Sequence, residues 1–175
     1  MSDAKTVGII GAGQMGCGIA HVFALSGFRV LLNDISQDRI EAGIATITGN
    51  MARQIASGKL AEADSEAALA RIHPATNLGA MAEADLAIEA ASENEAIKIE
   101  ILREVSSVLA PDAIIASNTS SISITRLAAA TDRPEQFIGM HFIFASPIKA
   151  ENIILRNNTR VHPTDVPSAT SWFIL

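Results

Sequence analysis

Three closely spaced glycines near the amino terminus form a motif that could bind the phosphates of a nucleotide. Gly11, Gly13 and Gly16 follow a short β-branched run and precede residues that favour a helix. Between a strand and a helix, such glycines allow a tight turn, close approach of the backbone to a pyrophosphate, and close packing of the helix on the sheet. The free N–H groups at the start of the helix then face the phosphates. Gln14 and Met15 complete the turn and are predicted to lie beside the same ligand.

An acidic residue follows the second apolar run. Asp34 lies there, where a carboxylate can accept hydrogen bonds from both hydroxyls of an adenine ribose and would repel a 2′-phosphate. The glycine turn and Asp34 together therefore favour NAD over NADP as the cofactor. The alternative is a structural turn without a ligand, in which Asp34 only begins the next helix.

Strands and helices alternate along the first 142 residues, and this alternation must position the candidate residues. Short apolar runs bounded by turn residues predict strands, and apolar residues repeated every three or four positions predict helices. We predict strands at residues 6–10, 28–33, 75–77, 84–90, 113–116 and 137–142, and helices at residues 14–25, 37–57, 61–71, 95–109 and 122–130. Ser36 is the expected N-cap of the long second helix. The pattern predicts an α/β fold with a doubly wound, mainly parallel sheet of the Rossmann type.

Composition excludes several other classes of protein. The chain has 175 residues, of which 49% are apolar and 18% are charged, so it can bury a core. Its net charge of −6 offers no basic surface for nucleic acid. No apolar run is long enough for a membrane helix, and no secretory signal precedes the first strand. A single cysteine excludes a disulfide framework and a thiolate metal cluster, so we expect a cytoplasmic protein without a metal site.

Four motifs occur in order between residues 5 and 142. They are Val7-Gly8-Ile9-Ile10-Gly11-Ala12-Gly13-Gln14-Met15-Gly16, Ile88-Glu89-Ala90, Ala116-Ser117-Asn118-Thr119-Ser120-Ser121 and Gly139-Met140-His141-Phe142. Together they closely resemble the 3-hydroxyacyl-CoA dehydrogenases, in particular those that act on 3-hydroxybutyryl-CoA. The resemblance implies reversible, NAD-linked oxidation of a 3-hydroxyacyl-CoA to a 3-oxoacyl-CoA in fatty-acid metabolism. It also implies a Rossmann-type domain with an inserted helical hairpin.

The same resemblance assigns roles to individual residues. His141 matches the family's catalytic histidine, and an imidazole with an ordinary pKa of ~6.5 suits removal of the hydroxyl proton. Ser120 matches the serine that contacts the substrate oxygen near the nicotinamide. Glu93, Lys98 and Asn118 are assigned to the cofactor. The structural alternatives are a strand-end histidine satisfied by the backbone, a serine that caps a helix, and a solvated ion pair at the start of a helix.

The remaining candidate side chains are interpreted as structural or as less specific matches. The cysteine and the other histidines are expected to serve packing: Cys17, His21, His73 and His162. Lys59 and Arg53 fall where the family's helical hairpin meets CoA, but surface cations are usually only solvated.

Residues 143–175 depart from the family pattern, so we treat residues 1–142 as the NAD-binding domain and the rest as an atypical tail without a separate domain. The family's asparagine and glutamate positions after the histidine hold Phe144 and Ile153. Glu151 could orient the imidazole only if the loop were two residues shorter. The family's helical C-terminal domain, which closes over the acyl-CoA and forms the dimer interface, is expected to be absent.

These departures leave three functions open. A histidine base without an orienting carboxylate loses its fixed tautomer and orders of magnitude in rate. The chain is therefore predicted to be an impaired dehydrogenase that takes an acyl-CoA substrate. It could instead be a non-catalytic NAD-binding module, or a domain that docks on a separate helical partner through its apolar end. A homo-oligomer is a further alternative.

Overall fold

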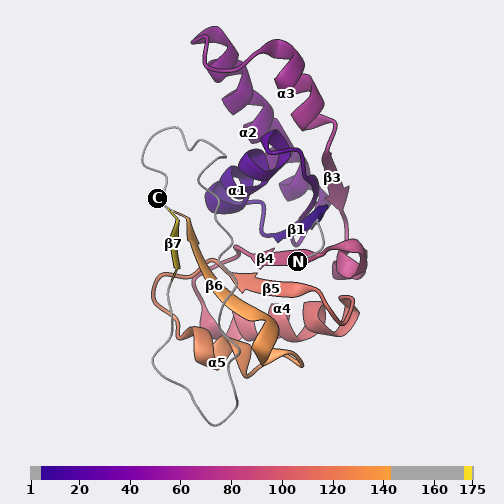
Figure 1. The fold of residues 1–175 in the computed structure, drawn as a ribbon, viewed down its shortest axis with the longest axis vertical. Helices are drawn as coiled ribbons and strands as arrows, with labels where there is room; N and C mark the ends of the chain where they lie inside the picture. Colours follow the sequence, from indigo (N-terminus) through magenta and orange to yellow (C-terminus); the bar gives the residue numbers. More distant parts are fainter. Residues whose placement is uncertain (1–4, 143–171, 175) are drawn as a thin grey trace.

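A parallel β-sheet forms the centre of the structure (Figure 1). The computed structural model describes residues 5–142 and 172–174. All neighbouring strands are parallel, in the order β3-β2-β1-β4-β5-β6-β7. The strands are β1 (Thr6–Ile10), β2 (Arg29–Asn33), β3 (Ile72–Ala75), β4 (Leu86–Glu89), β5 (Ile114–Ser117), β6 (Phe137–Phe142) and β7 (Trp172–Ile174). This order confirms the predicted doubly wound α/β fold.

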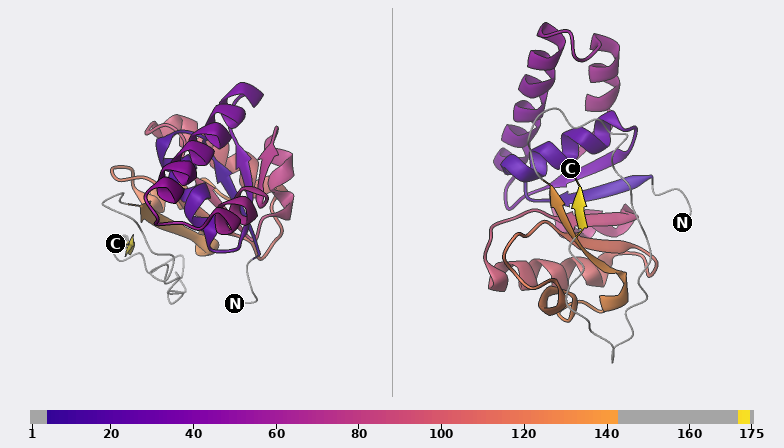
Figure 2. Two further views of the ribbon diagram at one scale, coloured as in Figure 1. Left: turned by 90° about the horizontal axis from the view of Figure 1, so that it is seen from above. Right: turned by 60° about the vertical axis from the view of Figure 1, so that its left-hand side comes forward.

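Helices cover both faces of the sheet. They are α1 (Gln14–Leu25), α2 (Gln37–Ala56), α3 (Glu62–Leu69), α4 (Glu95–Val108) and α5 (Ile124–Ala128), with two short 3-10 helices, η1 (Leu78–Glu83) and η2 (Pro134–Gln136). Helices α1 and α2 lie on one side of the central strands, and α4 and α5 lie on the other (Figures 1 and 2). None of the helices among the described residues is long and apolar enough to cross a membrane.

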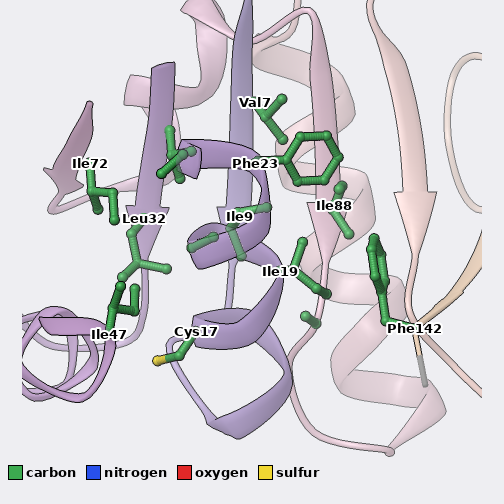
Figure 3. Close-up of a cluster of buried hydrophobic side chains, with 14 of the residues drawn as sticks. Val7, Ile9, Cys17, Ile19, Phe23, Leu32, Ile47, Ile72, Ile88 and Phe142 are labelled. Atoms are coloured by element: carbon green, nitrogen blue, oxygen red, sulfur yellow. The ribbon is translucent and has the colours of Figure 1, made fainter. Parts of the chain in front are cut away.

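Alternate residues of each strand fill two separate cores. Val7 and Ile9 of β1 are wholly buried in one cluster with Phe23 of α1 (Figure 3). Ile10 points to the opposite face and belongs to a second cluster with Leu102 of α4. Because both faces are covered, the central strands are apolar at nearly every position, as expected for a parallel sheet. The two cores together hold the carboxyl ends of the strands in place.

Helices α2 and α3 form the hairpin that the family resemblance implies. Ser36 caps α2 by accepting the N–H of Arg39 at 3.4 Å, which confirms the predicted start of this helix. The hairpin rises beyond the sheet in Figure 1. The base of α2 lies against the glycine turn, because a Cβ at Gly43 would lie only 2.9 Å from the Cβ of Ala12. A glycine at this point therefore allows the hairpin to begin beside the turn.

The first edge strand lies earlier than the sequence predicts. We expect a strand at residues 75–77, but β3 ends at Ala75 and contains Pro74. Proline cannot donate to a strand ladder, so it is tolerated here because β3 lies at the edge of the sheet. Asn77 instead caps η1, where its side chain accepts the N–H of Ala80 at 3.2 Å.

The opposite edge carries a strand that the sequence pattern does not predict. We expect residues 137–142 to form the last strand, but β7 pairs in parallel with β6, with Trp172 opposite Met140 and Ile174 opposite Phe142. The other residues of the predicted tail, including Glu151 and His162, lie outside the described residues.

Candidate active site

Parallel strands bring residues that are far apart in the sequence to one edge of the sheet. The glycine turn follows β1, Asp34 follows β2, Glu93 follows β4, residues 118–121 follow β5, and His141 lies near the end of β6. Between β1 and β4 the strand order reverses. In open α/β sheets, ligands bind at such a switch point, outside the carboxyl ends of the strands. The fold thus gathers the predicted site residues along one edge of the sheet.

The glycine turn has a different requirement at each glycine. Gly11 has φ of 110°, a backbone conformation that side chains disfavour. A Cβ at Gly16 would lie 1.7 Å from the carbonyl oxygen of Gly11, so this position accepts no side chain. At Gly13, by contrast, a Cβ would meet no atom within 4 Å. Gln14 is exposed beside it, and Met15 is half-buried against the core.

The open side of this turn fits a diphosphate. Gly13 occupies the N-cap of α1 but supplies no side-chain hydrogen bond, and no acidic residue lies in the first turn of the helix. The first N–H groups of α1 therefore keep the positive end of the helix dipole for an anion. A glycine with open space above it lets the backbone approach that anion closely. The residues present at this turn thus fit the phosphates of NAD.

Asp34 ties the end of β2 to the glycine turn. Its Oδ2 accepts the N–H of Ala12 at 2.7 Å, and its Oδ1 accepts the N–H of Ile35 at 2.7 Å. The same carboxylate forms an ion pair with Arg39, whose Nε lies 3.1 Å from Oδ1. Ser36, rather than Asp34, caps α2, and the ribose-binding role of Asp34 stays a prediction.

Glu93 holds the loop that follows β5. Its Oε1 accepts hydrogen bonds from the Thr119 hydroxyl, from the N–H of Ser120 at 3.1 Å, and from both the N–H and the hydroxyl of Ser121. Burial alone would raise the pKa of Glu93, but the hydrogen bonds from Thr119 and Ser121 and the charge of Lys98 outweigh it and hold this pKa at about 2. Glu93 is therefore ionised at neutral pH.

Lys98 is wholly buried, so the solvated-pair alternative is wrong for this residue. Its Nζ lies 2.8 Å from both carboxylate oxygens of Glu89 and 3.6 Å from Oε2 of Glu93. Glu89, the buried partner of Lys98, is not among the residues predicted for the cofactor site. The signal was its position within an apolar strand, because a buried carboxylate requires a partner.

The loop after β5 also contacts β6 beside His141. The side-chain Oδ1 of Asn118 accepts the N–H of Phe142 at 3.2 Å. His141 is half-buried, whereas Ser120 is exposed. Neither Ser120 nor Ser121 caps α5, since Ser123 does so by accepting the N–H of Arg126 at 3.5 Å. The helix-cap alternative for Ser120 is therefore wrong.

The residues interpreted as structural occupy packing positions. Cys17 is buried, its Sγ lies 3.1 Å from the carbonyl oxygen of Ala12, and burial raises the pKa of its thiol. This thiol is thus poorly suited to chemistry. His21 is buried in α1, and His73 lies in edge strand β3. Within the described part of the chain, no group of three histidine, cysteine or acidic side chains could hold a metal ion.

The two cations of the hairpin that the family resemblance places near CoA are exposed to solvent. Lys59 and Arg53 are both exposed, and the guanidinium of Arg53 contacts the side chain of Asn50 on the same helix. Nothing in these contacts distinguishes a ligand site from a solvated surface.

Comparison with known proteins gives a consistent result. The family model described as "3-hydroxyacyl-CoA dehydrogenase, NAD binding domain" matches residues 6–157. The chain is 58% identical over 144 residues to a 3-hydroxybutyryl-CoA dehydrogenase of Bradyrhizobium diazoefficiens, a match that covers 82% of this chain and 49% of the relative. It is 46% identical to a probable 3-hydroxybutyryl-CoA dehydrogenase of Deinococcus radiodurans, covering 81% of this chain and 50% of the relative.

Solved structures agree with the sequence relatives. The crystal structure of (S)-3-hydroxybutyryl-CoA dehydrogenase from Ralstonia eutropha matches with a TM-score of 0.79 and 48% identity, covering 81% of this chain and 50% of that one. The chain thus spans about half the length of the relatives that it matches.

Proposed function

Because the chain belongs to the 3-hydroxyacyl-CoA dehydrogenase family through its NAD-binding domain, we propose that it serves the NAD-dependent interconversion of 3-hydroxyacyl-CoA and 3-oxoacyl-CoA. The observation that carries this proposal is the convergence of the glycine turn, Asp34, the Ser120 loop and His141 on one edge of the sheet. The relatives' names specify 3-hydroxybutyryl-CoA, and we propose a substrate of this class for this chain.

The residues of the chain divide the work between binding and proton transfer. When bound, NAD would supply the hydride acceptor. Gly13 and the start of α1 would hold its diphosphate, and Asp34 would accept the hydroxyls of its adenine ribose. Oε2 of Glu93 lies 3.6 Å from the ammonium of Lys98, and the Glu93 side chain is 41% exposed, so this carboxylate could also contact the cofactor.

His141 and Ser120 would act on the substrate. Neutral His141 would remove the proton of the substrate hydroxyl, and the exposed Ser120 hydroxyl would hold the same oxygen. Asn118 fixes the backbone next to His141 through the N–H of Phe142, so the imidazole belongs to the same frame as the serine loop. The substrate of the proposed enzyme would be an acyl-CoA.

A second candidate is a module that binds NAD without turnover. It is favoured by Phe144 and Ile153, which replace the asparagine and the orienting glutamate of the family pattern. The glycine turn and Asp34, which would hold the cofactor, lie outside this departure from the family pattern. We keep docking on a helical partner, a homo-oligomer and a cytoplasmic location as proposals that rest on the sequence alone.

One titration tests these functions. NADH fluorescence is followed as the folded chain is added, and acetoacetyl-CoA is then added to the same cuvette to look for loss of NADH. Binding followed by loss of NADH supports the dehydrogenase, and binding alone supports the module. Failure of the folded chain to bind NADH would overturn both.

His141→Gln is the matched variant for the chemical step. It should leave the NADH Kd within about twofold while lowering turnover by about 10²–10⁴, the usual contribution of a general base. Equal turnover in the variant and the parent chain would remove His141 from the mechanism.

A further inference from the structure

We propose that Glu89 is a positioning residue, which anchors the start of the loop that carries Ser120 through Ser117 and the end of that loop through Lys98 and Glu93. The proposal deepens the proposed function and rests on it, since it concerns the same cofactor and substrate site. A carboxylate buried in strand β4 would destabilise the fold if it had no partners. The role of Glu89 therefore depends on the groups that its carboxylate contacts.

Every donor that reaches the Glu89 carboxylate comes from a buried or half-buried part of the site. Both oxygens accept from the ammonium of Lys98 at 2.8 Å, Oε1 also accepts the N–H of Ala91 at 2.7 Å, and Oε2 accepts the hydroxyl of Ser117. The side chains of Glu89, Lys98 and Ser117 have no exposed surface. Strand β4, strand β5 and helix α4 are thus joined at one carboxylate.

Lys98 connects Glu89 to Glu93, because its ammonium pairs with both carboxylates. Its ammonium lies between two carboxylates, at 2.8 Å from Glu89 and 3.6 Å from Glu93. The Glu93 side chain is 41% exposed, so its own pairing is partly screened by solvent. Glu89 is therefore the partner that defines where the ammonium lies, and the ammonium in turn attracts Glu93 toward the loop.

The two carboxylates hold opposite ends of the loop after β5. Glu89 binds the hydroxyl of Ser117 at its beginning, and Glu93 binds the N–H groups of Ser120 and Ser121 at its end. Between them, the N–H of Asn118 donates to the carbonyl oxygen of Glu89 at 2.7 Å. One ammonium thus links two anchors of the segment that carries Ser120.

Glu89→Gln tests the proposal, with Glu83→Gln as the matched control. Glu83 also forms an ion pair, with Arg29, but it lies on the surface away from the loop. In Glu89→Gln, amide exchange at Ser120 and Ser121 should accelerate about tenfold, and the NADH Kd should rise about tenfold, as expected for one lost charge-assisted bond. Glu83→Gln should change neither quantity.

A double variant separates positioning from general stability. Glu89→Gln with Lys98→Met removes both buried charges, and such replacement of a pair often restores stability. We expect its melting temperature to return toward that of the parent chain while Ser120 and Ser121 still exchange quickly. Recovery of slow exchange along with stability would overturn the proposal, because the pair would then serve only the fold.

The two readouts also separate this proposal from the proposed function. If the folded parent chain fails to bind NADH, the proposed cofactor site is wrong, whereas amide exchange still judges the role of Glu89. If the parent chain binds NADH, and Glu89→Gln changes neither its affinity nor the exchange of Ser120 and Ser121, Glu89 is not a positioning residue.

Discussion

Glycines of the same turn differ in what they do, because one is constrained by the fold and another faces open space. Gly16 lies against the carbonyl of Gly11, while the position of a Cβ on Gly13 is empty. The same residue type therefore serves packing at one position and ligand access at the other. This difference allows fold and binding to be tested separately within a few residues.

Alanine at each of these two glycines should give opposite results. Gly16→Ala should destabilise the fold strongly, since its Cβ would lie 1.7 Å from a backbone oxygen. Gly13→Ala should leave the melting temperature nearly unchanged but weaken NADH binding about tenfold or more, because the methyl group would stand where the diphosphate approaches. Thermal unfolding and fluorescence titration measure the two effects. Unchanged NADH affinity in Gly13→Ala would place the ligand elsewhere.

Asp34 should control the choice between NADH and NADPH through its ion pair with Arg39. Asp34→Asn keeps an acceptor for the N–H of Ala12 but removes the negative charge, which frees the guanidinium of Arg39 for a 2′-phosphate. We expect the ratio of NADH to NADPH affinity to fall about tenfold to a hundredfold, in line with one or two charge-assisted bonds. Adding Arg39→Met to this variant should abolish the gain for NADPH. A ratio that stays constant would contradict the role of Asp34 in selection.

At the scale of helices and strands, the contact between α1 and α2 contains a titratable group without full hydrogen bonding. His21 is buried in α1, and its Nε2 has no hydrogen-bond partner among the residues that the structure describes. Burial lowers the pKa of His21, and the nearby side chain of Gln54 on α2 opposes this only in part. The fold therefore prefers the neutral ring.

This preference predicts a loss of stability in mild acid. Since the pKa is lower in the folded chain than in the unfolded one, the unfolded chain binds the proton first as pH falls below about 6.5. The free energy of unfolding should therefore be constant above about pH 6.5 and decrease below it. The full decrease should be about 1.4 kcal/mol for each pH unit that separates the pKa of His21 in the folded chain from that in the unfolded chain. His21→Leu should flatten the decrease between pH 6.5 and 5 in urea unfolding curves. An equal decrease in both chains would assign it to other groups.

Local sequence patterns predicted the helices, strands and turns better than they predicted the polar contacts between these elements. The glycine turn, the cap at Ser36 and the apolar strands each depend on neighbouring residues, and the structure confirms them. The pairing of Lys98 with Glu89 depends on the packing of α4 against β4, so the sequence offered only a cofactor contact or a solvated pair for Lys98. The anchors from Glu93 to Ser120 and Ser121 span 27 and 28 residues and have no periodic signal. Long-range polar contacts such as Lys98 to Glu89 and Glu93 to Ser120 were thus not predicted from the sequence patterns.

Across the whole molecule, the proposed cofactor would contact both halves of the fold, one on the β1 and β2 side of the switch point and the other on the β4 and β5 side. The glycine turn and Asp34 belong to the side of β1, β2, α1 and α2, whereas Glu93 and the Ser120 loop follow β4 and β5, and β4 packs against α4. A ligand held by both groups stabilises only the state in which the two halves are correctly docked. Its binding energy should therefore appear in the global unfolding transition.

NADH should accordingly raise the melting temperature of the chain as a whole. At 100 times its Kd, a ligand of the folded state adds about 2.7 kcal/mol, which for a chain of this size corresponds to a rise of about 5–10 °C. NADPH at the same concentration should give a much smaller rise, because Asp34 disfavours its 2′-phosphate. Calorimetry would register a single transition that moves as one unit. A split transition, with only one part shifted by NADH, would show that the cofactor contacts one half alone and that Glu93 and the Ser120 loop lie outside its reach.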